Sequence, residues 1–151
     1  MKVNILKIAV LLLFLAGSFL SCEKDDKQKL PIMIIGGGNG GGGIDPKQDK
    51  VIKSQKEWES LLMALPKSEV DYFSETEIDF NIYIIIVIID KVRPSTGWSF
   101  YVSCIIEYYD RIVVTVNVKA PSGIALTVLT QPYQIVKIPV TTKSIEFHHI
   151  D

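Results

Sequence analysis

Residues 78–118 read IDFNIYIIIVIIDKVRPSTGWSFYVSCIIEYYDRIVVTVNV and contain the most regular hydrophobic patterning of the chain. The first part, Phe80 to Ile89, is an apolar run rich in β-branched residues, which predicts a strand that is buried on both faces. From Trp98 onward apolar and polar residues alternate, and a second alternating run follows Asp110. This period of two is typical of strands with one face in the core. We therefore expect three neighbouring antiparallel strands, joined by a polar loop at residues 93–97 and a tight turn at Asp110.

One face of the second strand carries most of its large apolar side chains. The alternation places Trp98, Phe100, Val102 and Cys104 together on that face, with Ile106 and Tyr108. A thiol in such surroundings is expected to be buried and unreactive, so Cys104 is not a candidate nucleophile.

A helix is expected ahead of this region. Ser54 and Glu57 have the spacing of a capping box, in which each side chain bonds the backbone near the other. An apolar stripe with helical spacing follows, at Trp58, Leu61, Leu62 and Leu65, and Pro66 ends the pattern. We expect this stripe to cover the second face of the strand at Phe80 to Ile89.

Two more strands are expected after a turn at residues 120–123. Residues 133–138 alternate, and prolines at 132 and 139 favour a position at a sheet edge. A last strand, Ser144 to Ile150, is expected to turn Ile145 and Phe147 inward. Together these elements predict an α+β fold, with one N-terminal amphipathic helix packed on a curved antiparallel sheet or partial β-barrel.

The N-terminus has the features of a bacterial lipoprotein signal. Ile8 to Leu20 is apolar but shorter than the roughly 20 residues that a spanning helix needs. The small residue Ser21 then precedes Cys22. We expect residues 1–21 to be a lipoprotein signal peptide and Cys22 to be acylated, which would attach the protein to a membrane through its lipid. A soluble secreted product is the alternative.

Residues 22–50 are expected to be a flexible charged and Gly-rich tether in front of a single domain at 51–151. Lys24, Asp25 and Asp26 resemble the signal that sends lipoproteins of Bacteroidetes-type bacteria to the outside of the outer membrane. A plain charged spacer is the alternative, so the expected address is the outer membrane, on its periplasmic or its cell-surface face.

The glycine run at residues 36–43 also favours a linker. It holds seven of the ten glycines and satisfies a GxGxxG search. A dinucleotide site needs a helix to begin directly after that turn, and none is expected here. The short apolar stretch Pro31 to Ile35 before it either adds an edge strand or belongs to the linker.

The composition excludes several classes of function. The formal net charge is −1, with 16 basic and 17 acidic residues and no basic cluster, so a nucleic-acid partner is not expected. The two histidines, His148 and His149, are adjacent on an expected strand and therefore point to opposite faces, which excludes a joint metal site. No catalytic constellation appears, so we expect neither an enzyme nor a cofactor or metal.

Five segments in order resemble the C-terminal domain of the PrcB protease-complex-subunit family. They are KEWESLL from Lys56, IDF at 78–80, VRPSTGWSF at 92–100, IVVTV at 112–116 and TQPYQIVKIP at 130–139. That family has an Arg-Pro loop that runs into a Gly-Gly-aromatic-Ser strand; here Thr96 replaces the first glycine. The resemblance implies a non-catalytic lipoprotein that binds or stabilises another secreted or surface protein, such as a protease. It also implies a contact surface at Arg93, Pro94, Ser95, Thr96, Gly97 and Trp98.

A second resemblance concerns the same loop. PSTGW, Pro94 to Trp98, is similar to the Asn-Pro-Thr-Thr-Gly-Tyr loop with which chagasin-type inhibitors fill the cleft of papain-like proteases. A rigid Pro94, a flexible Gly97 and an exposed Trp98 suit such a wedge. Those inhibitors are all-β, whereas this chain predicts a helix before the loop. Two alternatives remain: a loop that only turns the chain, with Trp98 in the core, and a surface lipoprotein with an unrelated binding role.

Overall fold

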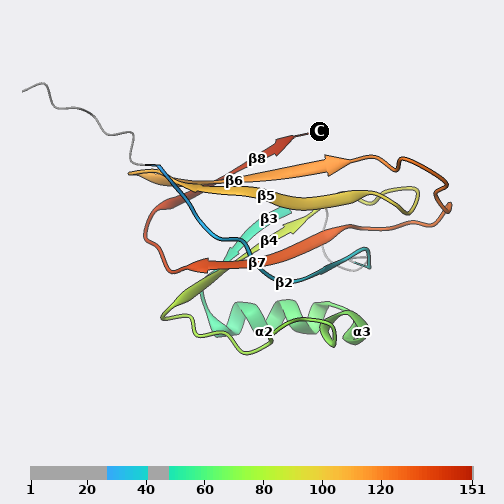
Figure 1. The fold of residues 1–151 in the computed structure, drawn as a ribbon. Helices are drawn as coiled ribbons and strands as arrows, with labels where there is room; N and C mark the ends of the chain where they lie inside the picture. The colour runs from blue at the N-terminus through green and yellow to red at the C-terminus, as the bar shows by residue number, and fades with distance from the viewer. Residues whose placement is uncertain (1–26, 41–47, 151) are drawn as a thin grey trace, which may run out of the picture.

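The computed structural model describes residues 27–40 and 48–150, which form two β-sheets and a helical layer. Sheet A has the strand order β1-β5-β6-β8, and sheet B has the order β2-β7-β4-β3. Figure 1 shows sheet A, sheet B and the helices as three successive layers. The strand bounds are β1 Gln28–Lys29, β2 Met33–Gly38, β3 Gln48–Ile52, β4 Tyr83–Ile89, β5 Ser99–Glu107, β6 Arg111–Lys119, β7 Tyr133–Pro139 and β8 Ser144–Ile150.

This architecture corrects the expected fold in one respect. The described part of the chain is mainly β, and its strands form two separate sheets that do not close, where one curved sheet or partial barrel was expected. The expected helix is present as α2, Gln55–Ala64, followed by the short α3, Lys67–Val70. None of the helices in residues 27–40 and 48–150 is long and apolar enough to cross a membrane.

Strand β4 lies at the centre of the molecule and is buried on both faces, as its apolar run predicts. Alternate residues serve two different cores. Ile84, Ile86 and Ile88 belong to the core between the two sheets, and the intervening residues Ile85, Val87 and Ile89 pack toward α2. The strand begins later than expected, because residues 79–82 form a turn in which the Asp79 side chain accepts a hydrogen bond from the backbone N–H of Asn81.

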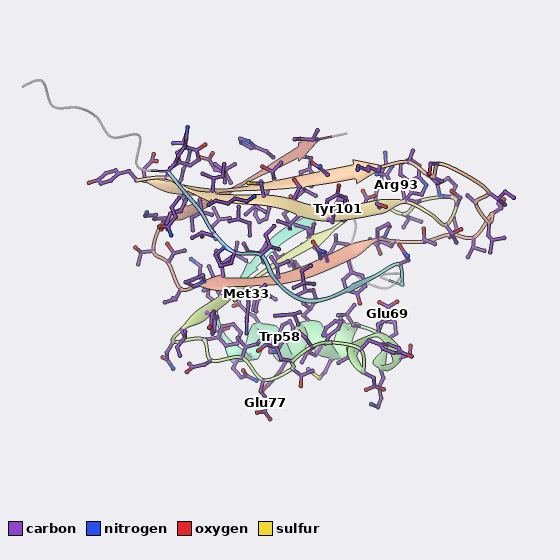
Figure 2. The ribbon with its side chains drawn as sticks, viewed as in Figure 1. Met33, Trp58, Glu69, Glu77, Arg93 and Tyr101 are labelled. Carbon is purple, nitrogen blue, oxygen red and sulfur yellow. The ribbon has the colours of Figure 1, made fainter. Side chains whose placement is uncertain are left out.

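Helix α2 covers the outer face of sheet B through its apolar stripe. Ser54 Oγ accepts a hydrogen bond from the Glu57 N–H, and Glu57 accepts bonds from the Ser54 hydroxyl and the Lys53 N–H. These bonds lower the pKa of the Glu57 carboxyl below its usual value, with the Ser54 hydroxyl as the largest cause. Trp58 is fully buried, and its indole N–H donates to the Thr76 carbonyl at 2.8 Å. Figure 2 shows Trp58 between the helix and sheet B.

Three neighbouring antiparallel strands were expected, but the first of them, β4, does not lie beside the other two. Strands β5 and β6 form the predicted hairpin, but β4 lies in sheet B, so the loop between β4 and β5 carries the chain from one sheet to the other. A β-bulge lies between Val102 and Cys104. Because a bulge adds one residue, it changes which side chains face the core. Phe100 and Val102 are buried, but after the bulge Ile105 is buried and Cys104 is only half-buried, contrary to expectation.

Strand β7 is central in sheet B, where an edge position was expected. It pairs with β2 on one side and with β4 on the other. The two prolines do not interrupt these ladders, because Pro132 lies just before the strand and Pro139 is its last residue. Proline disfavours only positions that must donate within a ladder.

The tether expected at residues 22–50 is wrong wherever those residues are described. Strands β1, β2 and most of β3 lie within that range, so the domain includes residues well before Val51. In β2, Gly36 packs against the Phe73 ring and Gly38 against the Glu69 carboxylate. A Cβ atom at either position would clash with these neighbours, which explains why both residues are glycines. Residues 1–26 and 41–47 lie outside the described residues, and with them the signal peptide, Cys22, Lys24, Asp25 and Asp26.

The last strand, β8, runs parallel to β6 at the edge of sheet A. Ile145 and Phe147 pack against the core between the sheets, as expected. The two histidines point to opposite faces, with His148 exposed and His149 partly buried. Its Nε2 lies 2.7 Å from Asp49 Oδ2, and its ring stacks on Phe100. In the described part of the chain, no group of three or more His, Cys, Asp or Glu side chains could hold a metal ion.

Candidate functional site

Two long connections meet at one end of the sandwich, which we call the loop end. They are the β4–β5 loop, residues 90–98, and the β6–β7 loop, residues 120–132 (Figure 1). A third connection reaches the same place, because the Gln131 N–H donates to the carbonyl of Asn39, just after β2. Loops that are clustered on a rigid scaffold are a common location for binding surfaces. The loop end contains all six residues of the contact surface that the sequence implies.

Arg93 holds the loop end together from inside. Its Nε lies 2.6 Å from Asp90 Oδ2, and the two side chains are only 9% and 1% exposed. Arg93 and Thr130 also exchange two backbone hydrogen bonds, at 2.7 and 3.0 Å, which join the two loops. Figure 2 shows Arg93 at the loop end. Arg93 is therefore not exposed, because its guanidinium lies inside the domain, and its part in a contact surface stays a prediction.

Trp98 is neither a core residue nor a protruding wedge. The Arg93 guanidinium carbon lies 4.0 Å from the centroid of the Trp98 ring, and the indole N–H donates to Ser95 Oγ at 3.2 Å. One face of the half-buried ring is thus occupied by Arg93, a stacking that favours one fixed orientation. Gly97 has a φ of 85°, which only glycine adopts without strain, so the turn into β5 depends on it.

The β6–β7 loop is fixed to the β4–β5 loop through Thr96 and Ser95. The backbone N–H of Thr96 donates to the Leu126 carbonyl, and the Leu126 N–H donates to Thr96 Oγ1, both at 3.0 Å. The Thr130 hydroxyl donates to the Ser95 carbonyl at 2.9 Å. The polar residues Ser95 and Thr96 therefore hydrogen-bond the neighbouring loop, and this explains why polar residues stand between Pro94 and Gly97.

Held in this way, the β6–β7 loop presents aliphatic side chains to solvent. Ile124 is fully exposed, and Leu126 and Leu129 are 65% and 75% exposed. Val128 and Val92 are each more than half exposed. Sequence reasoning treated residues 124–130 only as the approach to β7 and missed this cluster. The available signal was an apolar segment, IALTVLT, that contains no charge and follows a Pro-Ser-Gly turn.

A groove of about 610 Å³ adjoins the loop end, between the edges of β2 and β5. Aromatic side chains contribute much of its lining, among them Tyr72, Phe73, Trp98, Tyr101 and Tyr133. Strand β1 pairs with β5 only at Ile106 and Glu107, so residues 99–104 of β5 have no described strand on that side. The Gln134 side chain accepts a hydrogen bond from the Val102 N–H across this open edge. Open edges of this kind accept extended peptides.

A buried phenol, that of Tyr133, lies beside the groove. Burial raises the pKa of the Tyr133 phenol well above its usual range, and the neighbouring Glu69 carboxylate adds to the rise. Burial thus favours the neutral form of this phenol. What the loop end and the groove offer a ligand is aliphatic and aromatic surface together with an open strand edge.

Comparisons with protein-family models, with curated proteins and with solved structures found no match to this chain. The resemblance to the PrcB family therefore stays a prediction from sequence. The same holds for acylation at Cys22, which lies outside the described residues.

Proposed function

We propose that this protein is a non-catalytic envelope lipoprotein whose loop end binds another secreted or surface protein. The observation that carries the proposal is the cluster of exposed aliphatic side chains at Ile124, Leu126, Val128 and Leu129. Contiguous exposed apolar surface with a polar rim is typical of interaction sites. Single exposed apolar residues are common on any protein, but four within six residues of one loop are not.

The fixed conformation of the two loops supports a binding role. Association is opposed by the entropy lost when loops and side chains become ordered. Here the Arg93–Asp90 pair and the bonds between Thr96 and Leu126 already hold the loops in place before any partner arrives. Within the predicted contact surface, Pro94, Ser95, Thr96 and Gly97 form the outer part, while Arg93 and Trp98 support it from below.

The address and the class of partner come from the sequence. Acylation of Cys22 would attach the protein to a membrane, and the resemblance at Lys24, Asp25 and Asp26 favours the outer membrane, on its periplasmic or its cell-surface face. The resemblance to the PrcB family favours a secreted protease as the bound protein. A surface lipoprotein with an unrelated partner uses the same loop end, so both versions of the proposal share one test.

The test is co-purification of the full-length lipoprotein from cells that express it, after mild crosslinking. Leu126→Ser combined with Leu129→Ser removes two of the exposed aliphatic side chains of the loop end. We expect recovery of the crosslinked partner to fall at least tenfold, because a central apolar contact contributes about 2 kcal/mol or more to binding. The thermal midpoint of unfolding should change no more than it does for other substitutions at exposed positions.

A matched control comes from the opposite end of the sandwich. Ile82 and Val140 are each about half exposed and are joined by a backbone hydrogen bond, next to the paired residues Tyr83 and Pro139. Ile82→Ser with Val140→Ser therefore removes similar apolar surface without touching the loop end. Equal recovery of the partner by both double variants would contradict the proposal.

The chagasin-type alternative has less support from the geometry. An inhibitor loop must enter a protease cleft. Trp98 does not project in this way, because its ring stacks on the Arg93 guanidinium and its indole N–H donates to Ser95 Oγ. The direct test is inhibition of papain by the purified domain. Block of papain at sub-micromolar concentration, lost in Pro94→Ala, would favour the inhibitor over the partner-binding lipoprotein.

A further inference from the structure

We propose that the end of the sandwich opposite the loop end rests on the membrane surface and directs the loop end away from the bilayer. This hairpin end consists of the β5–β6 turn, residues 108–110, the β7–β8 turn, residues 140–143, and Ile82. Its partner is the headgroup region of a phospholipid bilayer. The inference rests on the proposed acylation of Cys22 and adds an orientation to it.

The first argument is the short distance along the chain between the lipid and the hairpin end. Strand β1 begins at Gln28, which pairs with Glu107 directly before the β5–β6 turn. Gln28 is six positions after Cys22, and a fully extended chain spans at most about 3.3–3.6 Å per residue. The acylated residue therefore lies within about 20 Å of the hairpin end in any conformation of that segment.

The loop end lies farther from the lipid than this segment can reach. Strand β5 runs from Ser99 at the loop end to Glu107 at the hairpin end. Figure 1 shows the β4–β5 loop and the β5–β6 turn at opposite ends of the sheet. Eight strand residues at about 3.3 Å each make roughly 26 Å, and the loops extend beyond that. A domain that stands on its anchor therefore has the hairpin end next to the bilayer.

The surface of the hairpin end suits the membrane interface. Tyr109 is 88% exposed at the tip of the β5–β6 turn, and Ile82 and Val140 are about half exposed nearby. Tyrosine is enriched at the level of lipid headgroups, because its ring is apolar and its hydroxyl is polar. Lys143 joins the two turns, since its ammonium group donates to the Tyr108 carbonyl at 2.7 Å and contacts Glu107 at 2.9 Å.

Charge contributes little to this contact. Arg111 is paired with Asp110 at 3.1 Å and with Glu146 at 3.4 Å, and Lys143 is paired with Glu107. Residues 23–29 contain three lysines and three acids, so their formal charges cancel. The hairpin end is thus close to neutral, and contact should occur on zwitterionic lipid and depend weakly on anionic lipid.

The test uses the full-length acylated protein in phosphatidylcholine vesicles that contain spin-labelled lipid. Tyr109→Cys in a Cys104→Ser background accepts a single environment-sensitive fluorophore, because acylation blocks the thiol of Cys22. Two labelled variants serve as controls: Tyr72→Cys, at a residue 90% exposed after α3, and Leu126→Cys at the loop end. We expect the spin-labelled lipid to quench the fluorophore at position 109 at least twofold more than at either control position.

The outcomes separate the inference from the proposal beneath it. Vesicle flotation with equal or stronger quenching at Leu126→Cys overturns the orientation and leaves acylation standing. Failure of the unlabelled protein to float with vesicles overturns acylation and the orientation together. Preferential quenching at Tyr109→Cys in these phosphatidylcholine vesicles, little changed when anionic lipid is added, supports the hairpin end as the membrane contact.

Discussion

Arg93 and Asp90 form an almost completely buried ion pair at the point where the chain leaves sheet B for sheet A. The Asp90 carboxylate also accepts the Lys91 N–H at 2.8 Å, so both of its oxygens are bonded. Removal of one partner from a buried pair leaves an uncompensated charge, which is far more costly than the loss of an exposed pair. Arg93 is therefore a structural residue, although the sequence places it in a loop with the composition of a surface turn.

We predict that Arg93→Ala lowers the free energy of unfolding by about 3–5 kcal/mol, measured by urea denaturation. Arg111→Ala is the matched control. Arg111 also makes an ion pair and covers an aromatic ring, but its side chain is 38% exposed, so we expect a loss below about 1 kcal/mol. Similar small losses in both variants would mean that solvent reaches the Arg93–Asp90 pair.

Strand β2 shows how glycines can serve packing where composition predicts a linker. A Cβ at Gly37 would lie 2.9 Å from the Tyr133 carbonyl oxygen, a backbone atom of the central strand β7. A Cβ at Gly123 would meet nothing within 4 Å. We therefore predict that Gly37→Ala destabilises the domain by about 1–3 kcal/mol, as overpacking does, and that Gly123→Ala changes stability by less than about 0.5 kcal/mol. Thermal melts that rank the two variants in the reverse order would contradict this packing.

Core residues also lie in the N-terminal segment, at Leu30 directly after β1 and at Ile35 in β2. Leu30 and Ile35 are buried, one in the core between the sheets and the other in the core under α2. Burial of each such side chain contributes about 1.5–3 kcal/mol. We predict that deletion of residues 27–38 lowers stability by about 3–6 kcal/mol or abolishes cooperative unfolding, followed by circular dichroism on heating. An unchanged melting curve would mean that these residues are a tether, as the sequence predicts, and not part of the folded domain.

At the scale of elements, local patterns predicted what is local. The capping box at Ser54, the apolar run of β4 and the β5–β6 hairpin all follow from neighbouring residues. The transfer of β5 to the other sheet does not, because a polar loop has the same composition whether it joins two strands of one sheet or crosses to another. The structured glycines of β2 were equally hidden, since their partners Glu69 and Phe73 lie some 30 residues away.

The whole molecule has two ends with different chemistry. The sequence drew attention to the β4–β5 loop, through its resemblance to the PrcB pattern, and missed the β6–β7 loop. That loop is held beside the first only by tertiary bonds such as those between Thr96 and Leu126. The opposite end receives the chain from Cys22. A membrane anchor at one end and a binding surface at the other would orient the protein toward partners outside the bilayer.

This organisation depends on acylation of Cys22, which gives the last prediction. Cys22→Ala should leave an unprocessed precursor on denaturing gels, and globomycin should have the same effect on the native chain, because lipoprotein signal cleavage requires the acylated cysteine. The native protein should partition into detergent. Cys104→Ala is the control, since Cys104 is half-buried in β5 and should affect neither processing nor partition. Recovery of the untreated native protein in the aqueous phase would refute the anchor and leave the loop end as the surface of a secreted binding protein.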